Sequence, residues 1–119
     1  MRMNCSNDLE LGSTVLVAPE GSLDSITTPV FLEEVTPHVT AGTPSLLLDL
    51  GHVDWMSSAG VGALVRLLAR TQSLGGGVAL FGCNSRVRTI LRVCGLEKVL
   101  NVRETAAEAR ARLQEVRPR

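Results

Sequence analysis

The sequence predicts an α/β domain with a small, mixed but mostly parallel sheet of 4–5 strands and about four helices. Short apolar runs alternate with amphipathic helical segments, at spacings typical of right-handed β-α-β crossovers. Residues 45–50 (SLLLDL) are nearly all apolar, which indicates a strand buried on both faces, as in parallel sheets covered by helices. Capping and turn residues separate the segments, so each element has recognisable ends.

Four further strands are expected from short apolar or alternating runs. They are residues 9–11 as an edge strand, then 14–18, 78–81 and 99–102.

Helix signals are local and specific. The first helix is expected to start at a Thr27 or Thr28 cap, with Pro29 in its first position, and to end near Pro37. The second follows Ser58 and is expected to bury Val61, Leu64, Val65 and Leu68, with Gly75 as its C-cap. The third is expected between an Asn84 or Ser85 cap and Gly95. The fourth starts at a capping box, Thr105 with Glu108, and runs to about Val116.

The composition predicts one globular domain over 1–119, with a core at about 9–116. Apolar residues make up 45% and aromatic residues only 3%, so the core is aliphatic. Few aromatic stacking platforms and no recognition-helix motif argue against direct nucleic-acid binding. Residues 1–59 carry one basic and eight acidic side chains, whereas residues 60–119 carry eleven basic and four acidic ones. Folding interleaves these halves into a mixed surface, or else leaves a basic face for an acidic protein partner.

The cysteines and the N-terminal segment indicate the compartment. Cys5, Cys83 and Cys94 are odd in number and lack CxxC spacing, which is typical of reduced thiols in a cytoplasmic protein. The N-terminal segment has no apolar signal core, and no apolar run approaches the roughly 18 residues of a membrane span. The expectation is a cytoplasmic chain without a membrane span.

Residues 49–66 (DLGHVDWMSSAGVGALVR) are the most informative segment. A buried strand leads into a turn that places Ser57 and Ser58 at a helix N-terminus, where free N–H groups and the helix dipole favour negative charge. A serine there can be a helix cap, a nucleophile or a phosphate acceptor.

Enzymatic chemistry has little support in the sequence. A serine nucleophile needs a general base, but His38 and His52 are poorly placed and GxSxG is absent. Asp24, Asp49 and Asp54 lack metal-ligand spacing, and both GxxxxGK[ST] and GxGxxG are missing. We therefore expect no enzyme activity, metal or cofactor. Two roles remain for the serines of the turn, helix cap and phosphate acceptor.

The pattern DLGHVDWMSSAGVGAL resembles the signature of the STAS domain family of bacterial anti-sigma factor antagonists, D-L/F-S-x-V-x-F-M/I-D-S-S/T-G-L/I-G. Almost the whole chain shares the resemblance: GSLD at 21–24 followed by Thr and Pro, Gly75-Gly76 before a strand, and VCGL at 93–96. It implies the STAS, or SpoIIAA-like, fold.

The resemblance also implies a function in transcription regulation. Such proteins bind an anti-sigma factor that is a GHKL-type serine kinase and release the sigma factor; phosphorylation breaks the complex and a PP2C-type phosphatase restores it. The acceptor falls on Ser58, with Ser57 as second choice. The partner-binding residues are expected to be Asp24, Ser57, Ser58, Ala59, Gly60 and Gly62, on a monomer or weak dimer.

The chain departs from the family pattern beside the acceptor. Ser57 replaces the usual aspartate, Ala59 replaces Ser or Thr, and Trp55 takes a Phe position, where a core anchor is expected. Two alternatives stay open: a non-phosphorylated interaction module of a stressosome-like or lipid-transport assembly, and a nucleotide-binding sensor.

Overall fold

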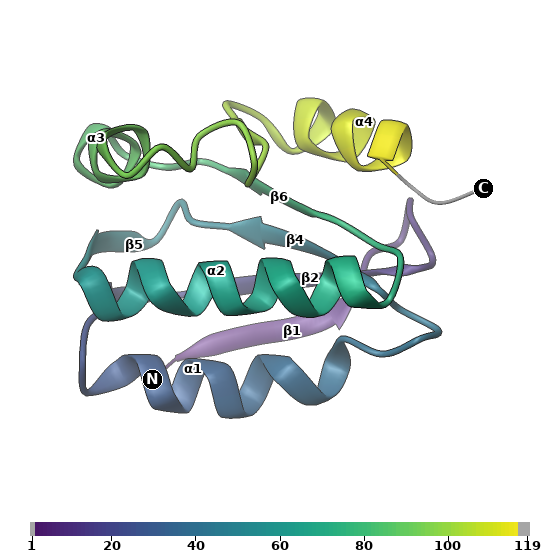
Figure 1. Ribbon diagram of the computed structural model, residues 1–119, viewed down its shortest axis with the longest axis horizontal. Coiled ribbons are helices and arrows are strands. Elements are labelled where there is room, and N and C mark those ends of the chain that lie inside the picture. Colours follow the sequence, from purple (N-terminus) through teal and green to yellow (C-terminus); the bar gives the residue numbers. More distant parts are fainter. Residues whose placement is uncertain (1, 117–119) are drawn as a thin grey trace.

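A computed structural model describes residues 2–116 and contains the predicted mixed, mostly parallel sheet (Figure 1). Its strand order is β1-β2-β4-β6-β7. The strands are β1 (Met3–Asn7), β2 (Thr14–Pro19), β4 (Ser45–Asp49), β6 (Val78–Phe81) and β7 (Val102–Arg103). Only β1 runs antiparallel to its neighbour; β2, β4, β6 and β7 are parallel.

A second, two-stranded sheet lies beside the first. It pairs β3 (Gly21–Leu23) with β5 (Val53–Met56) in parallel, with Gly21 opposite Val53 and Leu23 opposite Met56. This pairing brings the end of the 21–24 segment next to the serine turn, although 34 positions separate Leu23 from Ser57.

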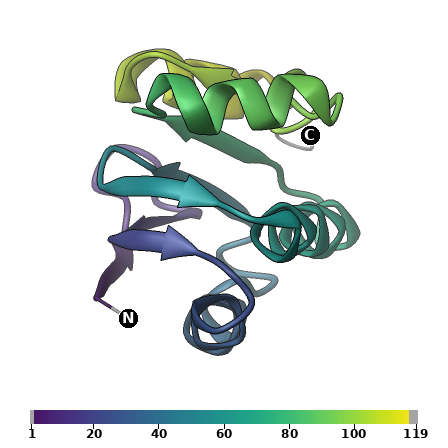
Figure 2. The same ribbon diagram turned by 90° about the vertical axis from the view of Figure 1, so that its left-hand side faces the viewer.

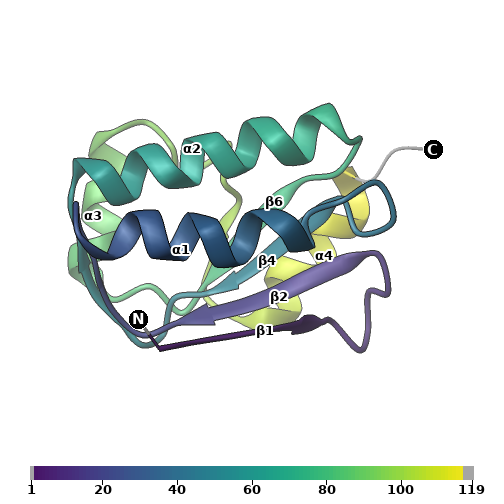
Figure 3. The same cartoon turned by 90° about the horizontal axis from the view of Figure 1, so that it is seen from below.

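The helices lie on both faces of the main sheet. They are α1 (Thr27–Val35), followed by a 3-10 turn over Thr36–His38, then α2 (Ser58–Ser73), α3 (Ser85–Val93) and α4 (Ala106–Val116). Viewed from below, α1 and α2 cover one face and α4 lies behind the other (Figure 3). Turning the molecule shows α3 and α4 on the side away from α1 (Figure 2). No helix within residues 2–116 is long and apolar enough to cross a membrane.

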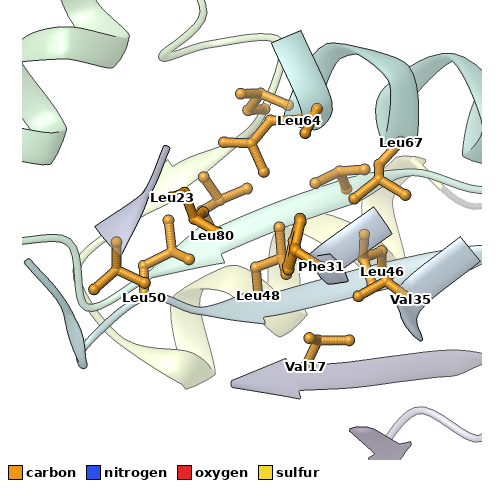
Figure 4. Close-up of a cluster of buried hydrophobic side chains, with 14 of the residues drawn as sticks. Val17, Leu23, Phe31, Val35, Leu46, Leu48, Leu50, Leu64, Leu67 and Leu80 are labelled. Atoms are coloured by element: carbon orange, nitrogen blue, oxygen red, sulfur yellow. The ribbon is translucent and has the colours of Figure 1, made fainter. Parts of the chain in front are cut away.

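Burial on both faces explains the continuous apolar run of β4. Leu46 and Leu48 pack into the cluster beneath α1 and α2, together with Phe31 and Leu67 (Figure 4). Leu47 points the other way, into a second cluster completed by Leu11, Ala79, Ala109 and Leu113. The prediction from SLLLDL is confirmed.

Several capping predictions are confirmed at the atomic level. Asn84 Oδ1 accepts a 2.8 Å hydrogen bond from the N–H of Val87 at the start of α3. Thr105 and Glu108 form the reciprocal capping box, since the Glu108 N–H donates to Thr105 Oγ1 at 3.2 Å and that hydroxyl donates to Glu108 Oε1 at 2.9 Å. Gly75 and Gly95 follow α2 and α3 with φ of 83° and 73°.

The start of α1 differs from the prediction. The helix begins at Thr27, so Pro29 is its third residue and neither threonine is the cap. The Asp24 carboxylate covers the helix start instead, because its Oδ1 accepts from the N–H groups of Ile26 and Thr27, both at 2.9 Å.

Both predicted peripheral strands are misplaced. The edge strand is residues 3–7, because Asp8 turns the chain: its carboxylate accepts the N–H of Leu11 at 3.1 Å, which leaves Leu9 fully exposed in the turn. Residues 97–101 form turns, in which Leu100 N–H donates to Leu96 C=O, so the last strand begins only at Val102.

The buried face of α2 is also rotated from the predicted one. Leu67 is buried whereas Val65 is 42% exposed, because the helix contacts the sheet through Gly60, Ala63, Leu64, Leu67 and Thr71.

Candidate functional site

The two adjacent serines have different surroundings. Ser57 is the N-cap of α2: its Oγ accepts from the Ala59 N–H at 3.2 Å, and its own N–H donates to the Leu23 carbonyl at 2.9 Å. Its side chain is half-buried and satisfied within the fold.

Ser58 is the first residue of α2 and is exposed. Its hydroxyl makes no hydrogen bond with any other residue in the 2–116 range. The Ser57 hydroxyl therefore has a structural role as the helix cap, whereas the Ser58 hydroxyl is exposed at the surface.

Gly60 and Gly62 differ in the same way. A Cβ on Gly60 would lie 2.7 Å from the Leu23 carbonyl oxygen and 2.9 Å from the Leu23 Cβ, so a side chain there would push α2 away from β3. A Cβ on Gly62 would meet no atom within 4 Å. Of these two glycines, close packing requires only Gly60.

The Asp24 carboxylate is engaged in covering α1. The hydrogen bonds from the N–H groups of Thr27 and Ile26 hold the pKa of Asp24 below its usual range, so it is ionised at neutral pH. The preceding residue, Leu23, contacts both Ser57 and Gly60. The predicted site residues 24 and 57–60 thus lie in two segments that meet at Leu23.

An apolar groove runs beside Ser58, between the start of α2 and α3. Its volume is about 360 Å³, and the lining residues are Trp55, Met56, Ser57, Ser58, Val61, Ile90 and Cys94. None of them carries a positive charge. We call this the α2–α3 groove.

A second groove lies on the other side of the turn, between the starts of α1 and α2. It measures about 580 Å³ and is lined by Ser25, Thr28, Pro29, Leu32, Ala59, Gly62, Ala63 and Arg66. The start of α2 is therefore a ridge between two largely apolar hollows.

The prediction that Trp55 anchors the core is wrong. Its side chain is 39% exposed and lines the α2–α3 groove. In the described part of the chain the short strand β5 has β3 as its one strand partner. Asn84 Nδ2 links β5 to α3 by donating to the carbonyls of Val53 (3.2 Å) and Asp54 (3.0 Å). Sequence reasoning did not identify Ile90 and Cys94 as neighbours of Ser58, because only the packing of α3 against β5 brings them there.

The histidines give the turn no catalytic base, since His38 and His52 are both exposed on other segments. Within residues 2–116 no three His, Cys, Asp or Glu side chains gather as metal ligands.

The fold defines a class of small α/β domain with a mixed sheet and a serine turn at the start of its central helix. The chain belongs to the STAS domain family, whose family model matches residues 7–109. Among curated proteins, a candidate anti-sigma factor antagonist of Thermotoga neapolitana is 33% identical over 78 residues, 66% of either chain. An anti-sigma-B factor antagonist of Staphylococcus aureus is 29% identical over 84 residues, 71% of this chain and 78% of that protein. These relatives are named as regulators, in agreement with the expectation of a non-enzymatic protein.

Solved structures share the fold. An anti-sigma factor antagonist from Mycobacterium paratuberculosis superposes with a TM-score of 0.76 at 21% identity, covering 95% of both chains. Bacillus SpoIIAA in its phosphorylated form gives 0.68 at 18% identity, covering 92% of this chain and 98% of that one. A sulfate transporter family protein from Wolinella succinogenes gives 0.72 at 17% identity, covering 87% of both. At these identities the likeness is one of fold, and it extends to domains of transporters.

Proposed function

We propose that the chain is an anti-sigma factor antagonist that binds a GHKL-type serine kinase through the start of α2 and is released when Ser58 is phosphorylated. The observation that carries this is the contrast between the serines: Ser57 is used as the cap, and Ser58 is exposed with an unbonded hydroxyl. Support also comes from relatives that are named anti-sigma factor antagonists.

The α2–α3 groove supplies a physical basis for the switch. A partner that covers the groove buries Ser58 beside Trp55, Val61 and Ile90. A phosphate on Ser58 carries roughly −1.5 to −2 charges, and the groove lining holds no cation to compensate them. Desolvation of that charge would disfavour the complex, which makes phosphorylation a release signal.

The same lining gives the nucleotide-sensor alternative little support, because it holds no cation that would bind phosphates alongside the N–H groups at the start of α2. The sulfate transporter family protein shares the fold at only 17% sequence identity. No feature of the two grooves favours a role in a transport assembly over a role as an anti-sigma factor antagonist.

Affinity capture from native lysate, with mass spectrometry of the partner and of the Ser57/Ser58 peptide, tests the proposal. We expect a serine kinase to be captured and to phosphorylate wild type and Ser57→Ala but not Ser58→Ala. Phosphorylation should weaken binding while the melting temperature moves by no more than a few degrees, because a helix N-terminus tolerates added negative charge. Phosphate on Ser57 alone, or equal affinity of both forms in calorimetry, would contradict the proposal.

A further inference from the structure

The outer edge of β1 is open. β1 stands first in the sheet order, and within residues 2–116 it pairs with β2 alone; Figure 3 shows it at the border of the sheet. The opposite border is β7, which has only two residues. Five-residue β1 is therefore the longer unpaired edge of the main sheet.

The hydrogen bonds to β2 determine which backbone groups of β1 face outward. The carbonyl of Arg2 accepts from Glu20 at 2.9 Å, and the N–H of Asp8 donates to Thr14 at 2.9 Å. Because these groups alternate along an antiparallel pair, the even-numbered residues bond to β2. The odd-numbered Met3, Cys5 and Asn7 direct their N–H and C=O groups away from the sheet.

This edge lacks the usual protection against pairing. Residues 3–7 (MNCSN) contain no charged residue, proline or glycine, and their register with β2 is continuous, without a bulge. Edge strands that stay unpaired normally carry charged residues, prolines or bulges that prevent pairing with another strand.

The edge is also complementary to itself. A second copy running antiparallel about Cys5 sets Cys5 opposite Cys5 and Met3 opposite Asn7, so that all outward groups of these residues pair. The same register places Arg2 opposite residue 8 of the second copy, close to Glu10, whose side chain is 71% exposed. The Asp8 carboxylate itself is buried and bonded to Arg110, so Glu10 is the acidic group that Arg2 can approach.

We propose that two copies of this chain associate through their β1 edges, antiparallel and centred on Cys5, forming one continuous sheet across the dimer. The pairs Met3–Asn7, Cys5–Cys5 and Asn7–Met3 each exchange two backbone hydrogen bonds. The proposal does not depend on phosphorylation of Ser58.

A proline substitution tests the contact. In Cys5→Pro the lost N–H is one that points away from β2, so the fold is kept while the outward edge is blocked. Cys5→Ala is the matched control. In sedimentation experiments, wild type and Cys5→Ala should rise with concentration from the 12.7 kDa of one chain towards twice that mass, whereas Cys5→Pro should not. A wild type that stays monomeric to millimolar concentration, or a Cys5→Pro variant that dimerises equally, would overturn the proposal.

Disulfide trapping tests the register and does not depend on the proline variant folding. Asn4→Cys and Ser6→Cys are introduced together into a Cys5→Ala, Cys94→Ser parent. Burial raises the pKa of the remaining Cys83 thiol to about 11, which keeps it unreactive. Positions 4 and 6 form a non-hydrogen-bonded pair across the dimer, with Cα atoms about 4.5 Å apart, within disulfide range.

Diamide then takes up two hydrogens for each interchain disulfide formed. We expect the double variant to cross-link at least about tenfold faster than either single variant. Equal rates would overturn the register. A dimer abolished by Trp55→Asp but kept by Cys5→Pro would place the contact in the α2–α3 groove instead and overturn the proposal.

Discussion

Ser57 and Ser58 are chemically identical neighbours, and their difference arises from one residue of helix geometry. An N-cap hydroxyl lies over the N–H groups of the first turn, while the next side chain points outward. The fold therefore uses the Ser57 hydroxyl and leaves Ser58 at the surface.

Stability measurements on single variants check this assignment. Ser57→Ala should lower the free energy of unfolding by about 1 kcal/mol, because the Ala59 N–H loses its acceptor. Ser58→Ala should change it by less than about 0.5 kcal/mol. Urea denaturation with unchanged m-values measures both. Equal losses in the two variants would mean that Ser58 also supports the fold.

At the scale of the element, α2 is positioned by what it lacks. Gly60 lets the helix approach β3 more closely than any residue with a Cβ would allow. The turn after α2 packs just as closely against the segment before β4, since a Cβ on Gly76 would lie 2.2 Å from the Pro44 carbonyl oxygen. Glycine at these two places sets the height of the helix above the sheet.

The pair Gly60→Ala and Gly62→Ala separates packing from helix propensity. Gly62→Ala should raise the free energy of unfolding by about 0.4–1 kcal/mol, because its Cβ enters open space and alanine favours the helix. Gly60→Ala should lower it by about 1–3 kcal/mol through overpacking against Leu23. Thermal and urea unfolding report both signs. Stabilisation by Gly60→Ala would show that α2 shifts at little cost.

Elements with strong local signals were predictable from the sequence. Each of these elements is determined by residues close together in the sequence: the apolar run at 45–50, the Asn84 cap and the Thr105–Glu108 capping box. β1 was not predicted, because only Met3 and Cys5 alternate with polar residues in MNCSN and its asparagines have low strand propensity; pairing with β2 makes it a strand.

The site follows the same division. Capping chemistry indicated the two serines, but their neighbours Ile90 and Cys94 depend on how α3 docks against β5. Trp55 was misassigned because a family position predicts the backbone better than it predicts exposure of the side chain.

At the scale of the whole molecule, Asp8 and Arg110 join the two ends of the described chain. The Arg110 guanidinium donates to both Asp8 carboxylate oxygens, at 2.9–3.2 Å, across 102 positions. Burial of Asp8 opposes its ionisation, but the hydrogen bonds from Arg110 and from the Leu11 N–H outweigh this and hold the Asp8 pKa below its usual range.

This pair makes stability depend on pH. Because the folded-state pKa of Asp8 is depressed, its contribution is complete above the unfolded-state pKa of about 3.9 and is lost as pH falls through the folded-state value. Asp8→Asn should cost about 3 kcal/mol at neutral pH, since it removes the buried carboxylate and leaves Arg110 with only the exposed Glu10, 3.7 Å from its Nε. The variant should also show a shallower loss of stability below about pH 4. Denaturation across a pH series measures this, and parallel curves for wild type and variant would exclude the pair as the acid-sensitive group.

The junction between β3 and the serine turn is made by main-chain atoms: the Ser57 N–H donates to Leu23 and the Gly21 N–H donates to His52, both at 2.9 Å. Under the proposed function, substitutions at Trp55, Ile90 or Cys94 should therefore change partner choice without moving Ser57 or Ser58. Duplicated genes for such a domain can diverge in partner choice one point mutation at a time, each intermediate still folded. A cell can in this way insulate parallel signalling circuits that share one scaffold.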